Sequence, residues 1–165
     1  MQREQFIKQV EGCQREFRRF LTALCCGDSA LADDIAQESF MKAYLSCEGL
    51  NDSAKFKSWI YRIGYNSFLN HVRGVRLTVG YEEAKMVKAE ERADGFSKYE
   101  ELYAALDKLP PSERTSILLY YIQDYSVKEI AEIIDVSEAA VRQHLSRGRN
   151  HLRGIFEMKK DEKRN

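Results

Sequence analysis

The sequence predicts an all-α protein made of two small helical domains joined by a flexible linker, with a helix-turn-helix in the C-terminal domain. Apolar residues recur at helical spacing through most of the 165 residues, and no segment alternates like a strand between glycine-rich turns. Both prolines stand together at positions 110 and 111, and a charged segment with weak periodicity separates the two periodic halves. We expect domains at 1–74 and 99–157, a linker at 75–98 and a charged, frayed tail at 158–165.

Three helices should build the first domain, because apolar residues recur at helical spacing in three stretches separated by polar turns. Gly27 and Asp28 end the first helix, and Asp28 or Ser29 caps the second. The third helix is dense in aromatic rings, with basic and amide side chains between them. We expect these helices at about 3–26, 31–44 and 55–73, with a polar loop at 47–53.

Two further helices should precede the helix-turn-helix. The fourth helix begins at Tyr99 and stops at Pro110 and Pro111, and the fifth opens at Ser112 and Glu113. The residues that we expect to pack inward are Leu102, Ala105, Leu106 and Leu109 in the fourth helix, and Ile117, Leu118, Tyr121 and Ile122 in the fifth.

The most informative stretch begins at Ser126, which forms with Glu129 the pattern of a capping box at the start of a helix. Asp135 interrupts that helix, and Val136 should be buried in the turn that follows. Ser137 is a suitable N-cap for a second helix. Two short helices joined by a tight turn are the pattern of a helix-turn-helix.

In the second of these two helices, Val141, Leu145 and Leu152 should point inward, and the small Ala131 of the first helix allows close approach. The exposed side then carries Arg142, Gln143, Ser146, Arg147 and Arg149. Arginine forks and glutamine amides suit phosphates and base edges in a DNA major groove. The alternative is a helical hairpin whose basic face is simply solvated.

One stripe of the third helix combines a ring with polar groups, namely Trp59, Arg62, Asn66 and Arg73. Aromatic rings stack on unpaired bases while cations follow the backbone, which is the chemistry of single-stranded nucleic-acid binding. The alternative is that the aromatic rings of this helix form a core. For Phe56, Tyr65 and Phe68 we favour the core.

The second helix has an acidic and polar side formed by Asp33, Asp34, Gln37 and Glu38. This side would repel DNA, and it could either receive arginines of a protein partner or be solvated. We expect no enzyme, because no nucleophile, metal-ligand spacing or glycine-rich phosphate loop accompanies these groups.

Composition limits the class further. Formal net charge is zero, but acids dominate from Leu102 to Val141 and bases dominate from Arg142 onward, which places positive potential late in the chain. No apolar run reaches membrane-spanning length, and the first twelve residues are too polar for a secretory signal, so we expect a cytoplasmic protein without membrane insertion. The four cysteines lack Cys-x-x-Cys spacing, so we expect reduced thiols in or near a core, no metal and no cofactor.

Three segments occur one after another along the chain: ADDIAQESFMKAY (32–44), FKSWIYRIGYN (56–66) and LDKLPPSER (106–114), the last followed by the helix-turn-helix. Together they resemble the bacterial sigma-70 superfamily, specifically the compact extracytoplasmic-function (ECF) sigma factors. The first segment is similar to that family's polymerase-binding helix and the second to its promoter-melting helix. The third is similar to the start of its upstream-element domain.

The resemblance implies a sigma factor that binds core RNA polymerase and directs promoter-specific transcription initiation. The first domain would bind the clamp helices of the largest polymerase subunit and capture unpaired bases of the −10 element. The second domain would lie against the polymerase flap and read the −35 element as duplex. An anti-sigma factor would be a further partner.

The resemblance also assigns residues to each surface. Core polymerase binding falls to Asp33, Asp34, Gln37, Glu38 and Phe40. The −10 set is Phe56, Lys57, Trp59, Arg62, Asn66 and Arg73, with the loop at 47–55 holding a flipped base. With the exposed helix face included, the −35 set is Ser126, Ser137, Glu138, Ala140, Arg142, Gln143, Ser146, Arg147 and Arg149.

Three positions depart from the family pattern. Asp135 stands where the turn usually has glycine, and the turn should survive because aspartate tolerates a left-handed backbone at some cost. His144 stands where arginine is frequent, which alters the expected phosphate contacts. Gly64 replaces a usual alanine and should loosen the third helix slightly.

Two other functions remain open. A stand-alone regulator would use only the helix-turn-helix, dimerise and bind duplex DNA without polymerase. An interaction module would bind polymerase or an anti-sigma factor without opening a promoter, and the stripe of the third helix argues against it. In the linker, the acidic residues Glu82, Glu83, Glu90 and Glu91 could occupy the nucleic-acid path of the polymerase until RNA displaces them.

Overall fold

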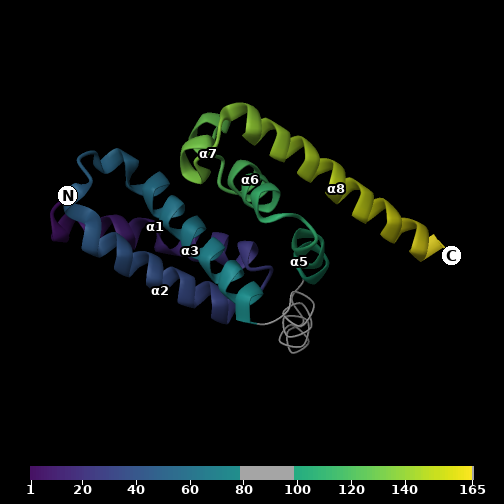
Figure 1. Cartoon of the computed structure of the whole chain (residues 1–165), viewed down its shortest axis with the longest axis horizontal. Coiled ribbons are helices and arrows are strands. Elements are labelled where there is room, and N and C mark those ends of the chain that lie inside the picture. Colours follow the sequence, from purple (N-terminus) through teal and green to yellow (C-terminus); the bar gives the residue numbers. More distant parts are fainter. Residues whose placement is uncertain (79–98, 165) are drawn as a thin grey trace. The chain divides into compact units, whose positions relative to one another are not determined.

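The computed structural model describes residues 1–78 and 99–164, and these parts are helical apart from turns (Figure 1). The chain divides into two compact units after residue 96, so residues 1–78 belong to the first unit and residues 99–164 to the second. The all-α class is confirmed for the described residues. The expected linker lies outside them from residue 79 onward, and so do Glu82, Glu83, Glu90 and Glu91.

The first unit is a three-helix bundle (Figure 1), in which α2 packs against both α1 and α3. After α1 the backbone turns through left-handed conformations at Cys26 and Gly27, with φ of 54° and 89°. The Asp28 carboxylate then accepts a hydrogen bond from the Leu31 N–H at 3.0 Å, so Asp28 is the N-cap of α2. The elements are α1 (Arg3–Leu24), α2 (Ser29–Ser46), the 3₁₀ turns η1 (Cys47–Gly49) and η2 (Ser53–Lys55), and α3 (Phe56–Thr78).

Large side chains from all three helices fill the centre of the first unit. The rings of Phe17 and Tyr61 meet edge to face with centroids 5.3 Å apart. A Cβ on Gly64 would lie 2.7 Å from the Phe17 ring, so this glycine allows α3 to approach α1 closely. Gly64 therefore has a packing function beyond the expected slight loosening of the helix. The core also contains Phe20, Leu21, Ile35, Phe56, Ile60, Tyr65 and Phe68, and the expected burial of Phe56, Tyr65 and Phe68 is confirmed.

The second unit contains four helices, and α6 and α7 pack against α8. In Figure 1, α8 is one long helix that ends near the C-terminus. Residues 158–164, which were expected to form a charged tail, are helical and belong to it. The elements are α5 (Glu100–Asp107), α6 (Pro111–Tyr121), α7 (Val127–Ile134) and α8 (Glu138–Arg164).

A buried arginine joins α5 to α6. The Arg114 side chain donates from Nε to the Leu106 carbonyl at 2.9 Å and from Nη2 to the Leu109 carbonyl at 3.1 Å. The Leu106 carbonyl lies in the last turn of α5 and also accepts from the Leu109 N–H at 3.1 Å, while the Leu109 carbonyl lies just after the helix. The Pro110-Pro111 pair stops one helix and opens the next, with Pro111 in the first turn of α6.

Four apolar side chains that were expected inside the second unit are exposed, namely Leu102, Tyr121, Ile122 and Val136. Each lies in the first or last turn of a helix or directly after its end, where fewer neighbouring helices cover a side chain. Val136 instead contributes its backbone, whose N–H donates to the Ala131 carbonyl at 3.1 Å. Helical spacing thus identified the right face of these helices but not how far along them burial extends.

Candidate nucleic-acid and polymerase interfaces

The helix-turn-helix is built by three local devices. Ser126 and Glu129 form a complete capping box at the start of α7, with bonds of 3.1 and 3.0 Å. Asp135 ends α7 in a left-handed conformation with φ 58° and ψ 55°, as expected for the residue in the glycine position. The Ser137 hydroxyl then accepts from the Ala140 N–H at 3.1 Å and starts α8.

The first half of α8 has a buried side and an exposed side. Val141, Leu145 and Gly148 are buried against the rest of the unit, and Leu152 is half-buried. A Cβ on Gly148 would lie 2.9 Å from Cγ1 of Ile117, so α8 and α6 are in close contact there. The opposite side exposes Ser137, Glu138, Arg142, Gln143, Ser146, Arg147 and Arg149, while Ala140 is half-buried. This exposed set is called the α8 face below.

Two members of the α8 face also have partners within the unit. The Arg142 guanidinium lies 4.0 Å from the Glu138 carboxylate one turn earlier. Arg149 donates from Nη1 to the Tyr121 hydroxyl of α6 at 3.0 Å. Exposed contacts of this kind are weak, so both guanidinium groups can exchange them for phosphate.

Histidines of α8 lie at its contact with α6. The His151 Nδ1 atom is 2.8 Å from Oε2 of Glu113, a residue of α6 that is almost fully buried. Burial lowers the pKa of His144, and Arg147 lowers it too, while Glu113 raises it. The Nδ1 atom of His144 is buried and has no hydrogen-bond partner among the residues that the structure describes. His144 therefore has its Nδ1 edge inside the unit and does not belong to the α8 face.

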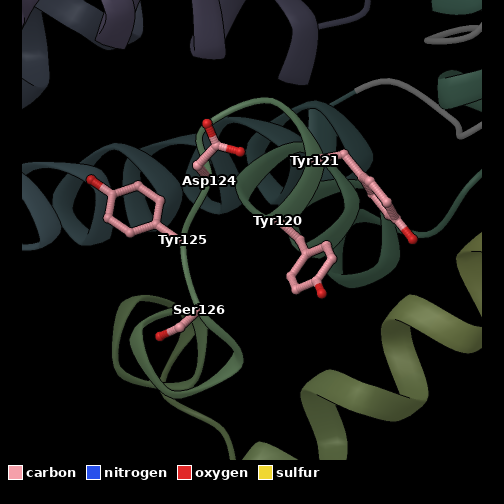
Figure 2. A pocket seen from close by; sticks show the side chains of 5 residues that line it. All are labelled: Tyr120, Tyr121, Asp124, Tyr125 and Ser126. Atoms are coloured by element: carbon pink, nitrogen blue, oxygen red, sulfur yellow. The ribbon is translucent and has the colours of Figure 1, made fainter.

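A shallow hollow lies where α6 meets α7 (Figure 2), with a volume of about 390 Å³. Its lining residues are Tyr120, Tyr121, Asp124, Tyr125 and Ser126. The Ser126 hydroxyl accepts the capping bond from Glu129, and its proton is still available to a phosphate oxygen. The hollow was not expected from the sequence, because Tyr121 was expected to pack inward.

In the first unit, the stripe of α3 is accessible. Arg62, Asn66 and Arg73 are exposed, and Trp59 is half-buried. The Trp59 ring lies edge to face on Phe56, with centroids 5.9 Å apart. Trp59 thus has one edge on the core, with Arg62 and Asn66 along the same helical stripe. This set of Trp59, Arg62 and Asn66 is called the α3 stripe below.

Two residues of the expected −10 set have other surroundings. The Phe56 ring is 1% exposed and lies against Phe6, so it supports Trp59 and offers no surface for a base. Lys57 is exposed, but its ammonium is 2.8 Å from the Glu16 carboxylate of α1. The two 3₁₀ turns before α3 are mostly exposed, and Asp52 caps the second by accepting from the Ala54 N–H at 3.0 Å.

The expected polymerase-binding residues of α2 also divide. Asp33, Asp34 and Gln37 are all exposed, and Asp33 also pairs with Arg18 of α1 at 3.1 Å. Phe40 is half-buried on the Phe17 ring at 5.3 Å. The Glu38 carboxylate contacts the side chains of Lys42 and His71.

Along the same stripe of α2 as Gln37 lie two apolar side chains that the sequence interpretation did not single out. Met41 is 66% exposed and Leu45 is 77% exposed. Their i, i+4 spacing from Gln37 was the signal that could have identified them. Asp34, Gln37, Met41 and Leu45 are together called the α2 face below.

The remaining groups indicate no other chemistry among the described residues. Each of the four cysteines is a buried thiol, and burial raises the pKa of Cys13. No cluster of metal-ligating side chains occurs in the described part of the chain. Within the same residues, no helix is both long enough and apolar enough to span a bilayer.

Comparison with known families gives two matches. Residues 10–78 match the model of sigma-70 region 2, and residues 99–152 match that of sigma-70 region 4. The chain is 29% identical over 143 residues to the ECF RNA polymerase sigma factor SigM of Bacillus subtilis, covering 84% of this chain and 86% of that protein. It is 32% identical over 138 residues to SigW of the same organism, an ECF sigma factor, covering 74% and 73%.

Two solved structures have a similar fold. The sigma factor RpoE of Bartonella quintana, crystallised with the anti-sigma factor NepR, is 20% identical and superposes with a TM-score of 0.73, over 92% of this chain and 96% of that one. CnrH, in complex with the cytosolic domain of CnrY, is 22% identical with a TM-score of 0.63, over 94% and 97%.

Proposed function

The chain belongs to the ECF group of the sigma-70 family and is a promoter-recognising transcription initiation factor, and we propose that three surfaces divide this work among themselves. The α8 face reads the −35 element as duplex. The α3 stripe holds unpaired bases of the −10 element. The α2 face binds the clamp helices of core RNA polymerase.

The α8 face supports −35 reading by its charge and its accessibility. It combines three exposed arginines with an exposed glutamine on one side of a helix whose start is firmly capped. Arginine recognises guanine edges or phosphates, and glutamine recognises adenine. The capped start of α7, with the Ser126 hydroxyl, adds a phosphate contact at the edge of the site.

The α3 stripe supports the capture of unpaired bases, and it is the observation on which the proposal most depends. A ring held by Phe56 stands beside an exposed guanidinium and an exposed amide, so one base can stack and be hydrogen-bonded at once. Lys57 and Arg73 add positive charge for the strand's backbone. Phe56 is left out of the base-contacting set, because its ring is inside the core.

The α2 face supports polymerase binding by its mixed composition. Met41 and Leu45 expose an apolar area beside Asp34 and Gln37, which is the combination of an apolar centre and a polar rim found in protein interfaces. Because the relatives are sigma factors, we place the chain in the cytoplasm with polymerase and assign it no catalytic activity of its own. We also propose control by an anti-sigma factor, a partner of the kind seen in the complex of RpoE with NepR.

The test is run-off transcription from genomic DNA with purified core polymerase, followed by permanganate footprinting of the promoters recovered. We expect transcripts and reactive −10 thymines only when the chain and core are both present. A mobility shift with duplex promoter should need core polymerase. Equal duplex binding without core would instead identify a stand-alone regulator, and polymerase binding without reactive thymines would identify an interaction module.

A further inference from the structure

A charged cluster joins α2 to α3 on one side of the first unit. Both carboxylate oxygens of Glu38 are used: Oε1 accepts from the Lys42 ammonium at 2.6 Å, and Oε2 lies 2.9 Å from Nε2 of His71. The Lys42 ammonium is also 3.4 Å from the Ser67 hydroxyl of α3. The two helices are thus connected at two points, one at Ser67 and one at His71.

The cluster favours an ionised Glu38. The hydrogen bond from Lys42 lowers the pKa of Glu38, and the contact with His71 lowers it further against the opposing effect of burial. About a third of the Glu38 and His71 side chains is exposed, whereas Ser67 is fully buried. The carboxylate is therefore held in one orientation toward α3, and both of its oxygens have partners before any other protein approaches.

The position of the cluster matters more than its strength. On α2, Glu38 follows Gln37 of the α2 face directly. On α3, Ser67 follows Asn66 of the α3 stripe, and His71 lies one turn further. The cluster therefore connects the backbone under the polymerase-binding surface to the backbone under the base-holding surface, with no intervening loop.

We propose that Glu38 and His71 are positioning residues that hold the α3 stripe at a set orientation to the α2 face, so that polymerase binding places the stripe over the −10 element. This inference rests on the proposed function of both surfaces. It changes the expected part of Glu38, which acts through α3 and does not contact polymerase. Lys42 and Ser67 complete the cluster by fixing the carboxylate.

The variants for the test are Glu38→Gln, His71→Ala, His71→Gln and the double variant Glu38→Gln/His71→Ala. The matched control is Glu11→Gln, which alters an exposed carboxylate of α1. Two quantities are measured for each: the affinity of the labelled chain for core polymerase, and the permanganate reactivity of −10 thymines at saturating polymerase. Thermal unfolding checks that each variant is folded.

We expect both single variants to bind core polymerase like the wild type and to open the promoter up to about fivefold less, the upper end of the range for a partly exposed ion pair. The double variant should be no worse than the more defective single variant, because each single substitution already removes the same contact between Glu38 and His71. His71→Gln keeps a donor for Glu38 and should recover much of the opening. It also serves as the test if His71→Ala is unfolded.

Four results would overturn the inference. A loss of core affinity in Glu38→Gln without one in His71→Ala would make Glu38 a direct polymerase contact. Additive opening defects in the double variant would show that the residues act independently. If both single variants opened the promoter as well as the wild type, the positioning role of Glu38 and His71 would be excluded, and the proposed function would stand. If the wild-type chain itself opened no promoter, the positioning role and the proposed function would both be excluded.

Discussion

Arginine has two different environments in the second unit, and the difference is one of burial. Arg114 is buried and donates to the last carbonyls of α5, so it stabilises the fold. Arg142 and Arg147 are exposed on α8, so their charge is available to DNA. Losing the hydrogen bonds of a buried charged donor costs about 1–3 kcal/mol, whereas removing an exposed one costs the fold almost nothing.

Gln143 should contribute specificity more than general affinity. Because its amide can bond an adenine edge in two places, Gln143→Ala should cost about 1–3 kcal/mol on the preferred −35 sequence and relax selection at one base pair. The measurement is transcription, or holoenzyme binding, on a set of promoters that vary the −35 element. Gln14→Ala, which alters an exposed glutamine of α1, is the matched control. An equal loss on every −35 sequence would indicate a phosphate contact instead.

His144 should make the second unit sensitive to acid. Its pKa is lowered mainly by burial, so the folded state prefers the neutral ring, and the unfolded chain binds a proton first as pH falls. The stabilising effect of this preference is complete above the unfolded pKa of about 6.5, and it is lost as pH falls through the folded pKa. Urea unfolding between pH 5 and 7.5 should show His144→Leu gaining stability over the wild type only toward the acid end. A difference that is constant with pH would contradict this.

At the scale of elements, local signals predicted the helices well. The capping box at Ser126, the Ser137 cap and the left-handed Asp135 are each set by a few neighbouring residues, and each occurs as predicted. Burial was predicted less well, because it depends on which helix covers which turn. Tyr121 and Ile122 fit the spacing of α6 but lie at its end, beyond the cover of neighbouring helices.

Gly64 tests how helix packing and helix propensity compete. Alanine favours a helix over glycine by about 1 kcal/mol, but its Cβ at Gly64 would lie 2.7 Å from the fully buried Phe17 ring. Overpacking costs about 1–3 kcal/mol, so we expect Gly64→Ala to be destabilising on balance. Urea unfolding gives the comparison, and adding Phe17→Leu should recover part of the loss.

Gly12 supplies the matched control for that measurement. It lies on the exposed side of α1, and a Cβ there would meet no atom within 4 Å. Gly12→Ala should therefore stabilise the first unit by up to about 1 kcal/mol through helix propensity alone. Stabilisation by both substitutions would mean that α3 can move away from α1 at little cost.

At the scale of the whole molecule, the sequence motifs predicted which surfaces exist, but not which residues within them face outward. The order of the three segments indicated the family, because each is a contiguous pattern. Phe56 and Glu38 share those motifs with exposed neighbours, yet one is in the core and the other is engaged by His71, 33 positions away. Such contacts follow from tertiary packing, and spacing along one helix carries no information about them.

Because the two proposed DNA-binding surfaces lie in different units, their variants should respond differently when the −10 element is already unpaired. If the α3 stripe holds bases that are already unpaired, its substitution raises the cost of keeping the −10 element open. An Arg62→Ala/Asn66→Ala variant should then be strongly defective on duplex promoter and recover on a template premelted at the −10 element, where the unpairing cost of a few kcal/mol is already met. Gln143→Ala should show the same defect on both templates, because the −35 element stays duplex in each.

The comparison is made by transcription with saturating core polymerase on the two templates, each with the same −35 element. Because the α8 face and the α3 stripe belong to different units, their effects should be additive on duplex DNA. The two classes of variant should separate only when the −10 element is premelted. If the α3 variant remained equally defective on both templates while core binding was normal, the stripe would act after strand opening, and base capture would not be its contribution. If Gln143→Ala recovered on the premelted template, the α8 face would not be reading duplex DNA.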